Sequence, residues 1–170
     1  LAGDDEMPLV PGLDAAAGVL SPEELEALVD AADAAWLRFV SLWREQGDAI
    51  VELLCSAEVA LDRRKFQPKS IRSTWRRELD ATCEAIEGGA NPALRAGHEP
   101  PARVAGWLTR EAIRAGTKPG EVAPAHPFFD AASALEEAAG ALSAAFEARA
   151  LALRRRFVEA CAALVHGAAE

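Results

Sequence analysis

The sequence HPFFDAASALEEAAGALSAAFEARALALRRRFVEACAALVH, residues 126–166, decides the fold of this chain. After Pro127 it contains no further proline and only one glycine, Gly140, and it is rich in alanine, the residue with the lowest cost in a helix. Its apolar residues recur at spacings of three and four: Phe128, Ala131, Leu135, Ala138, Leu142, Ala145, Phe146, Leu153, Phe157, Ala160, Cys161 and Leu164. This period predicts one helix of about forty residues, roughly 60 Å long, which needs a long partner.

The partner that we expect is a second long helix near the N-terminus. Ser21 can cap it, Pro22 suits its first position, and Glu24 completes a capping box. The apolar residues that follow share helical spacing: Leu25, Leu28, Val29, Ala32, Trp36, Phe39, Val40 and Trp43. The spacing resumes after Gly47, so we predict a helix to about Ser56. The pattern leaves open whether this helix breaks at Gly47.

Shorter elements are expected between the two long helices. Residues 57–69 read as a connector, Ser70 as the cap of the next helix, and Gly88–Gly89 as its end. The buried positions of that helix would be Ile71, Trp75, Leu79, Thr82 or Cys83, and Ile86. A loop at 90–101, a short helix at 102–114 and a loop at 116–126 complete the pattern, and no strand is indicated.

The predicted fold class is all-α: an elongated helical bundle with two long helices and shorter connecting helices. Residues 1–20 are expected to form an extended lead-in and residues 21–170 a single helical domain, a size that supports one core. The chain begins with Leu1 and has no signal-peptide pattern, so we expect an excised or processed segment of a cytoplasmic protein. Its three scattered cysteines predict buried thiols rather than disulfides or a zinc site.

Composition and motifs exclude several function classes. No apolar run approaches the length of a membrane span, and the net charge of −9 disfavours general binding to nucleic acid or anionic membranes, so we expect no membrane partner. The chain has no phosphate-binding loop, no Glu-x-x-His pair and no nucleophile turn. We therefore predict no catalytic residue, no metal site and no cofactor within these residues.

The charge is unevenly distributed. Nine acidic residues and no Lys or Arg precede Arg38, whereas residues 62–77 hold seven bases against the single acid Asp62. These candidate DNA-contact residues are Arg63, Arg64, Lys65, Lys69, Arg72, Arg76 and Arg77. Clustered bases are what phosphate contact requires, although the alternative is a solvated face paired with the acidic first helix. The run Arg154–Arg156 is a weaker cluster, because consecutive residues spread around a helix.

The order of short sequence words resembles the helical 1B insertion of the RecB family, the beta subunit of exodeoxyribonuclease V. The words, in chain order, are Leu9-Val10-Pro11, Trp43-Arg44, Ala49 to Leu54, Trp75 to Leu79, Leu108-Thr109, Pro124 to Asp130 and Ala152 to Val158. In that family the insertion interrupts the first motor domain of a UvrD-like superfamily 1 helicase. The most specific word is the Pro-x-His-Pro-Phe-Phe stretch from Pro124 to Phe129.

The resemblance implies a non-catalytic accessory domain that guides duplex DNA and braces the motor of an ATP-dependent DNA helicase and exodeoxyribonuclease in double-strand break repair. The parent enzyme would use ATP and Mg²⁺, and its partners would be RecC- and RecD-like subunits and the rest of the RecB-like chain. None of its catalytic motifs occurs in these residues. Two other hypotheses stay open: a stand-alone helical protein-interaction module and a helical-bundle metalloenzyme.

Overall fold

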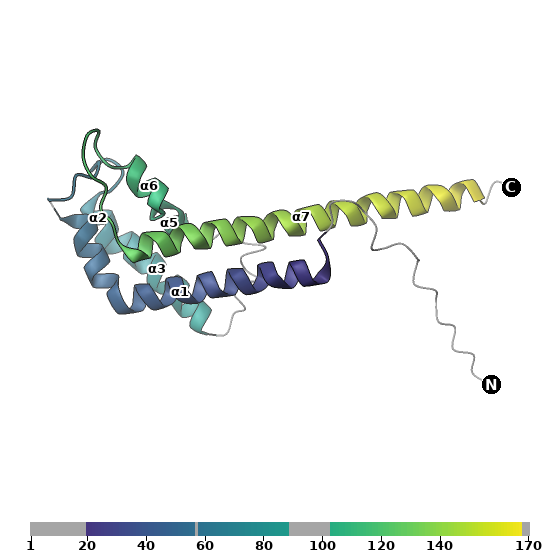
Figure 1. Ribbon diagram of the computed structural model, residues 1–170, viewed down its shortest axis with the longest axis horizontal. Helices are drawn as coiled ribbons and strands as arrows, with labels where there is room; N and C mark the ends of the chain where they lie inside the picture. The colour runs from purple at the N-terminus through teal and green to yellow at the C-terminus, as the bar shows by residue number, and fades with distance from the viewer. Residues whose placement is uncertain (1–19, 57, 89–102, 168–170) are drawn as a thin grey trace.

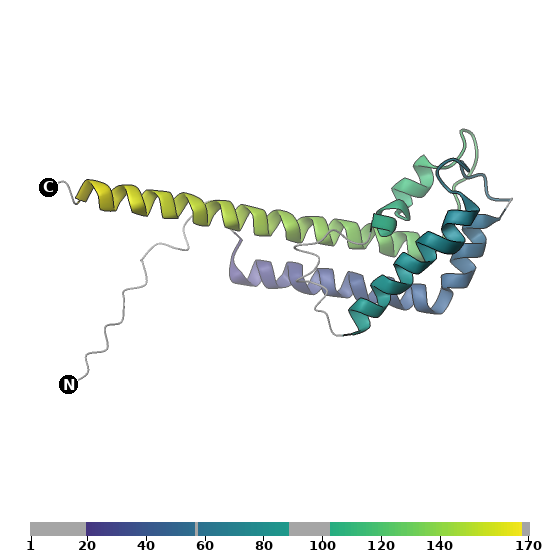
Figure 2. The ribbon, with the colours of Figure 1, turned by 180° about the vertical axis from the view of Figure 1, so that it is seen from behind.

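Two long antiparallel helices form the body of the molecule. The computed structural model describes residues 20–56, 58–88 and 103–167. Helix α1 (Pro22–Cys55) and helix α7 (Pro127–Gly167) lie side by side, and the shorter helices gather at one end of the pair (Figures 1 and 2). This arrangement confirms the predicted all-α bundle with two long helices; the predicted lead-in, Leu20 apart, and the loop at 90–101 lie outside the described residues.

Helix α1 begins as its sequence predicts and continues through its glycine. The Ser21 hydroxyl accepts a hydrogen bond from the Glu24 backbone N–H, while the Glu24 carboxylate accepts one from the Ser21 N–H at 2.7 Å, which is the reciprocal capping box. Gly47 lies inside the uninterrupted helix, so the helix does not break there. The ribbon nevertheless bends in its last third, which brings the end of α1 alongside the shorter helices (Figure 1).

The core lies between α1 and the first half of α7. The Phe128 ring packs against Phe39 and Trp43 with ring centroids 4.8 and 5.5 Å apart. Ala32 of α1 and Leu135 of α7 are fully buried as well, so the core contains both small and large side chains. Trp36, Phe39 and Trp43 are therefore core residues, as the sequence indicates, rather than a surface for stacking bases.

The middle of the chain forms one bent helical rod. It consists of α2 (Pro68–Ser70), the π-helical segment η1 (Ile71–Trp75) and α3 (Arg76–Glu87). The prediction that Ser70 caps this helix is wrong: the rod begins at Pro68, whose fixed φ suits a first helical position, and Ser70 already has helical angles. The predicted stripe is confirmed at Ile71, Trp75, Leu79 and Cys83, which are buried.

The predicted helix at 102–114 is two short helices instead of one. Helix α5 (Arg103–Trp107) and helix α6 (Arg110–Ala115) are separated at Thr109, whose extended backbone and side-chain cap of the Ala112 N–H start a new helix. An isolated bridge joins Leu61 in the connector to Thr117, and the Lys118 N–H donates to the Ala60 carbonyl at 2.8 Å. These bonds hold the connector against the loop that follows α6.

The second half of α7 extends beyond the start of α1 (Figure 2). Four apolar side chains on this part are exposed: Leu151, Leu153, Phe157 and Val158. No described helix is both long enough and apolar enough to cross a membrane. The prediction of three buried thiols is wrong for Cys161, which is exposed because α1 no longer covers α7 at that point; Cys83 is buried and Cys55 half-buried, and all three are free.

Candidate nucleic-acid interface

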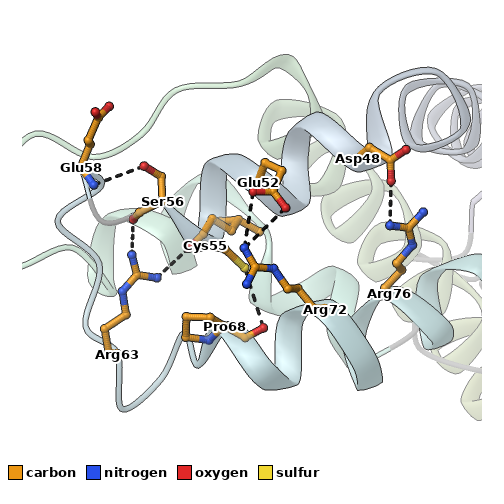
Figure 3. A network of polar contacts seen from close by, with 10 residues as sticks. Asp48, Glu52, Cys55, Ser56, Glu58, Arg63, Pro68, Arg72 and Arg76 are labelled. Carbon is orange, nitrogen blue, oxygen red and sulfur yellow. Dashed lines mark hydrogen bonds and ion pairs between the residues drawn. The ribbon is translucent and has the colours of Figure 1, made fainter.

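The seven predicted basic residues lie together, but the structure gives them different environments. They occupy the connector between α1 and α2 and the rod from α2 to the first turn of α3. Figure 3 shows three of them, Arg63, Arg72 and Arg76, engaged by groups of α1 or of the connector itself. The other four have no such partner among the described residues, and this division decides which of the seven can contact a ligand.

Arg63 holds the connector against the end of α1 through hydrogen bonds to backbone carbonyls. Its guanidinium donates to the Leu54 carbonyl at 2.7 Å and also to the Ser56 carbonyl, with longer contacts to Val59 and Phe66 carbonyls at 3.4 and 3.5 Å. The last turn of α1 contains no basic residue, so Arg63 supplies from the connector the positive charge that a helix C-terminus favours. Its donors are therefore directed at the backbone rather than at solvent.

Arg72 and Arg76 face carboxylates of α1. Arg72 lies 3.4 Å from Glu52, and Arg76 lies 2.7 Å from Asp48 and 3.8 Å from Asp80 one turn along its own helix. All of these side chains are largely exposed, so each pair contributes at most about 1 kcal/mol to stability. The pairs nevertheless neutralise the charges of Arg72 and Arg76, as in the alternative of a face paired with the first helix that the sequence left open.

Four exposed cations have no compensating carboxylate in the part of the chain that the structure describes: Arg64, Lys65, Lys69 and Arg77. Within residues 20–56, 58–88 and 103–167 no ion pair involves their side chains. Asp62, the one acid of the segment, instead accepts a hydrogen bond from the Arg64 backbone N–H at 2.9 Å, which fixes the turn of the connector. The geometry thus reduces the seven candidates to a smaller set, the open cation cluster.

A row of three aromatic rings lies beside this cluster. Phe66 packs edge-on against Trp75 with centroids 5.7 Å apart, and Trp75 packs against Trp107 at 5.1 Å. Phe66 and Trp75 are buried, whereas Trp107 is 39% exposed. The sequence did not single out Trp107 as a functional residue, because it fell on the apolar stripe of one predicted helix. The capping residue Thr109 is the sequence signal that the first helix ends before it, which places Trp107 at the last position of α5.

Hydrogen bonds and burial shift a few pKa values outside this cluster. The Glu87 carboxylate accepts two hydrogen bonds from Arg44, at 2.6 and 3.1 Å, which lower its pKa. Burial raises the pKa of the Cys83 thiol to about 11 and lowers that of His126. Across the described part of the chain, no group of three or more His, Cys, Asp or Glu side chains is placed to hold a metal ion.

The fold is therefore a helical bundle with four exposed cations and a group of three aromatic rings at the end where the shorter helices gather (Figure 1). Comparison with known proteins adds no relative: no protein-family model, no curated protein and no solved structure matches the chain.

Proposed function

We propose that this chain is a non-catalytic helical accessory domain of a RecB-like ATP-dependent DNA helicase and exonuclease, which guides duplex DNA and braces the motor. The observation that supports it is the open cation cluster of Arg64, Lys65, Lys69 and Arg77, exposed at one end of an otherwise acidic chain. When an unpaired Lys or Arg binds a DNA phosphate, a counterion condensed on the DNA is released, which favours binding. A Lys or Arg that is already paired must first break its ion pair with a carboxylate. The order of the short sequence motifs, which resembles that of the RecB family, supports the proposed parent enzyme.

The parent would act in the cytoplasm with RecC- and RecD-like subunits, and its ATP and Mg²⁺ would be bound outside these residues. Within this domain the proposed role is mechanical and electrostatic. The rigid α1–α7 pair would hold the open cation cluster at a fixed distance from the motor, and the cluster would follow the DNA backbone without reading its sequence.

The experiment compares two variants with the same change of net charge. One replaces the open cation cluster by alanine; the other replaces four exposed arginines elsewhere, Arg38, Arg149, Arg154 and Arg155. We expect the first to weaken binding to blunt duplex DNA by more than ~10-fold and to reduce the salt slope by up to roughly 0.9 per cation, and the second to change both little. Equal effects of the two variants would contradict the proposal.

A second candidate function is a stand-alone protein-interaction module. The observation that favours it is the exposure of four large apolar side chains on the far half of α7, among which Phe157 is 71% exposed. Exposed apolar surface of this kind marks contact sites. Sedimentation of the chain with and without Phe157→Ser tests it: a dimer that dissociates in the variant supports the module, and a monomer in both leaves the accessory-domain proposal preferred.

A further inference from the structure

The row of aromatic rings borders a cavity of about 510 Å³ at the junction of the connector, the π-helical segment and α6. Small-ligand sites typically have volumes of roughly 300–1,000 Å³, so one nucleotide fits. The cavity is lined by side chains from the connector, the helical rod, α5 and α6. None of the described residues that line it is acidic, which matches an anionic ligand.

The lining divides into three kinds of surface. Phe66, Trp75 and Trp107 contribute aromatic surface, and the exposed cations Arg64 and Lys65 contribute positive charge. Gln67 and Ser70 add an amide and a hydroxyl, which can donate to or accept from the edge of a base. An aromatic base with an attached phosphate has the same three kinds of surface.

The backbone supports a built site at this position. Trp75 is the last residue of the π-helical segment, and the Arg76 N–H donates to the Ile71 carbonyl five residues earlier. One π turn inserts an extra residue and turns the following side chains, and such turns are frequent at functional sites. On the opposite side Gly116 admits the Phe66 ring: a Cβ built there would lie 2.1 Å from the Phe66 Cε2.

We propose that this cavity binds one unpaired nucleotide of a DNA strand, with the base against the partly exposed Trp107 ring and its phosphate at Arg64 and Lys65. The inference rests on the proposed function, because it supposes that DNA lies on the open cation cluster. It adds a preference that phosphate contact alone does not give: DNA with a single-stranded end is bound more tightly than the blunt duplex.

The test measures affinities of the full chain for a hairpin duplex with a short thymidine overhang, for the blunt hairpin, and for thymidine monophosphate. We expect the overhang to bind roughly ten-fold more tightly than the blunt end, as one stacked base provides. Trp107→Ala should lower the affinity for the overhang to that for the blunt hairpin, whereas Trp107→Phe should keep most of the difference. Equal affinities for both hairpins, or an equal loss on both in Trp107→Ala, would overturn the inference.

A second pair of variants keeps the test decisive if Trp107→Ala does not fold. Ala115 is exposed at the cavity, so Ala115→Glu places a carboxylate there, while Ala134→Glu does the same on an exposed face of α7. Only Ala115→Glu should remove the preference for the overhang.

The outcomes separate the two proposals. If the chain binds neither hairpin, the proposed function fails and with it the inference of a DNA strand. If thymidine monophosphate binds as tightly as the overhang and depends equally on Trp107, the cavity is a site for free nucleotides and the strand is excluded. If blunt duplex binds through the open cation cluster without any preference for the overhang, only the further inference fails.

Discussion

Two adjacent arginines, Arg63 and Arg64, provide a sharp test of how the connector is held. Arg63→Ala removes one charged hydrogen bond of 2.7 Å to the Leu54 carbonyl, a second to the Ser56 carbonyl and two long contacts. A hydrogen bond to a charged group contributes about 1.5–3 kcal/mol, and part of the loss is recovered when water reaches the freed carbonyls. We therefore expect Arg63→Ala to lower the free energy of unfolding by about 3 kcal/mol.

The assay is urea unfolding followed by circular dichroism, with Arg64→Ala as the matched control. Arg64 is exposed and its side chain has no partner among the described residues, so its replacement should cost less than about 0.5 kcal/mol. Arg63→Lys should recover only part of the loss, because an ammonium group cannot reach several carbonyls with a planar fork. If Arg63→Ala and Arg64→Ala unfold at the same urea concentration, the assignment of Arg63 to the fold is wrong.

Three further predictions concern single side chains. Gly116→Ala should destabilise the fold by about 1–3 kcal/mol, because the new Cβ overlaps the Phe66 ring. The neutral His126 ring accepts the first free N–H of α7, and burial lowers its pKa from the ordinary 6.5. The unfolded chain thus binds this proton more readily, and stability should fall as pH falls through about 6.5. A thiol reagent at pH 8 should modify Cys161 rapidly and Cys83, with its pKa of about 11, only on unfolding.

Each of these predictions has a control. Gly140→Ala, where nothing lies within 4 Å of the new Cβ, should instead stabilise the helix by up to about 1 kcal/mol, since it removes only backbone freedom. A loss in both glycine variants would refute the overlap at Gly116. His126→Asn keeps a capping side chain that does not titrate, so the change in urea midpoint between pH 7.5 and 5.5 should become smaller. If that change stays the same, a group other than His126 causes the pH dependence of stability. Mass spectrometry of the labelled peptides identifies the order of cysteine modification.

The long helices could be predicted from the sequence because their signals are local and repeated. The capping box at Ser21 and the uninterrupted apolar period after Pro127 both lie within the element that they define. The helix break at Thr109 could not be predicted from the apolar spacing, because that spacing continues across it. The break is marked only by the cap of Thr109, which starts a helix of six residues. Ser70 was misjudged because proline and serine both mark helix starts, and the proline came first.

The sequence alone locates the seven basic residues, but it does not show which of them are free of ion pairs and so able to bind a ligand. Whether Arg72 is open to a ligand depends on Glu52, twenty positions earlier in the chain, and on the bend that brings the end of α1 beside the rod. In the same way the cavity needs Phe66 and Trp107 together, and no local pattern joins residues that far apart. Tertiary contacts therefore determine which of these basic residues can bind a ligand, whereas the sequence shows only where they lie in the chain.

The pairing of α1 with α7 also determines when this protein can fold. Phe39 and Phe128, whose rings meet in the core, are 89 residues apart in the sequence. At a synthesis rate of about 5–20 residues per second, the apolar face of α1 leaves the ribosome roughly 4–18 s before its partner is made. During that interval α7, which packs against Phe39 and Trp43 in the folded protein, is not yet available to cover them. Translation speed and chaperone capture, rather than helix propensity, are thus expected to set the yield of native protein.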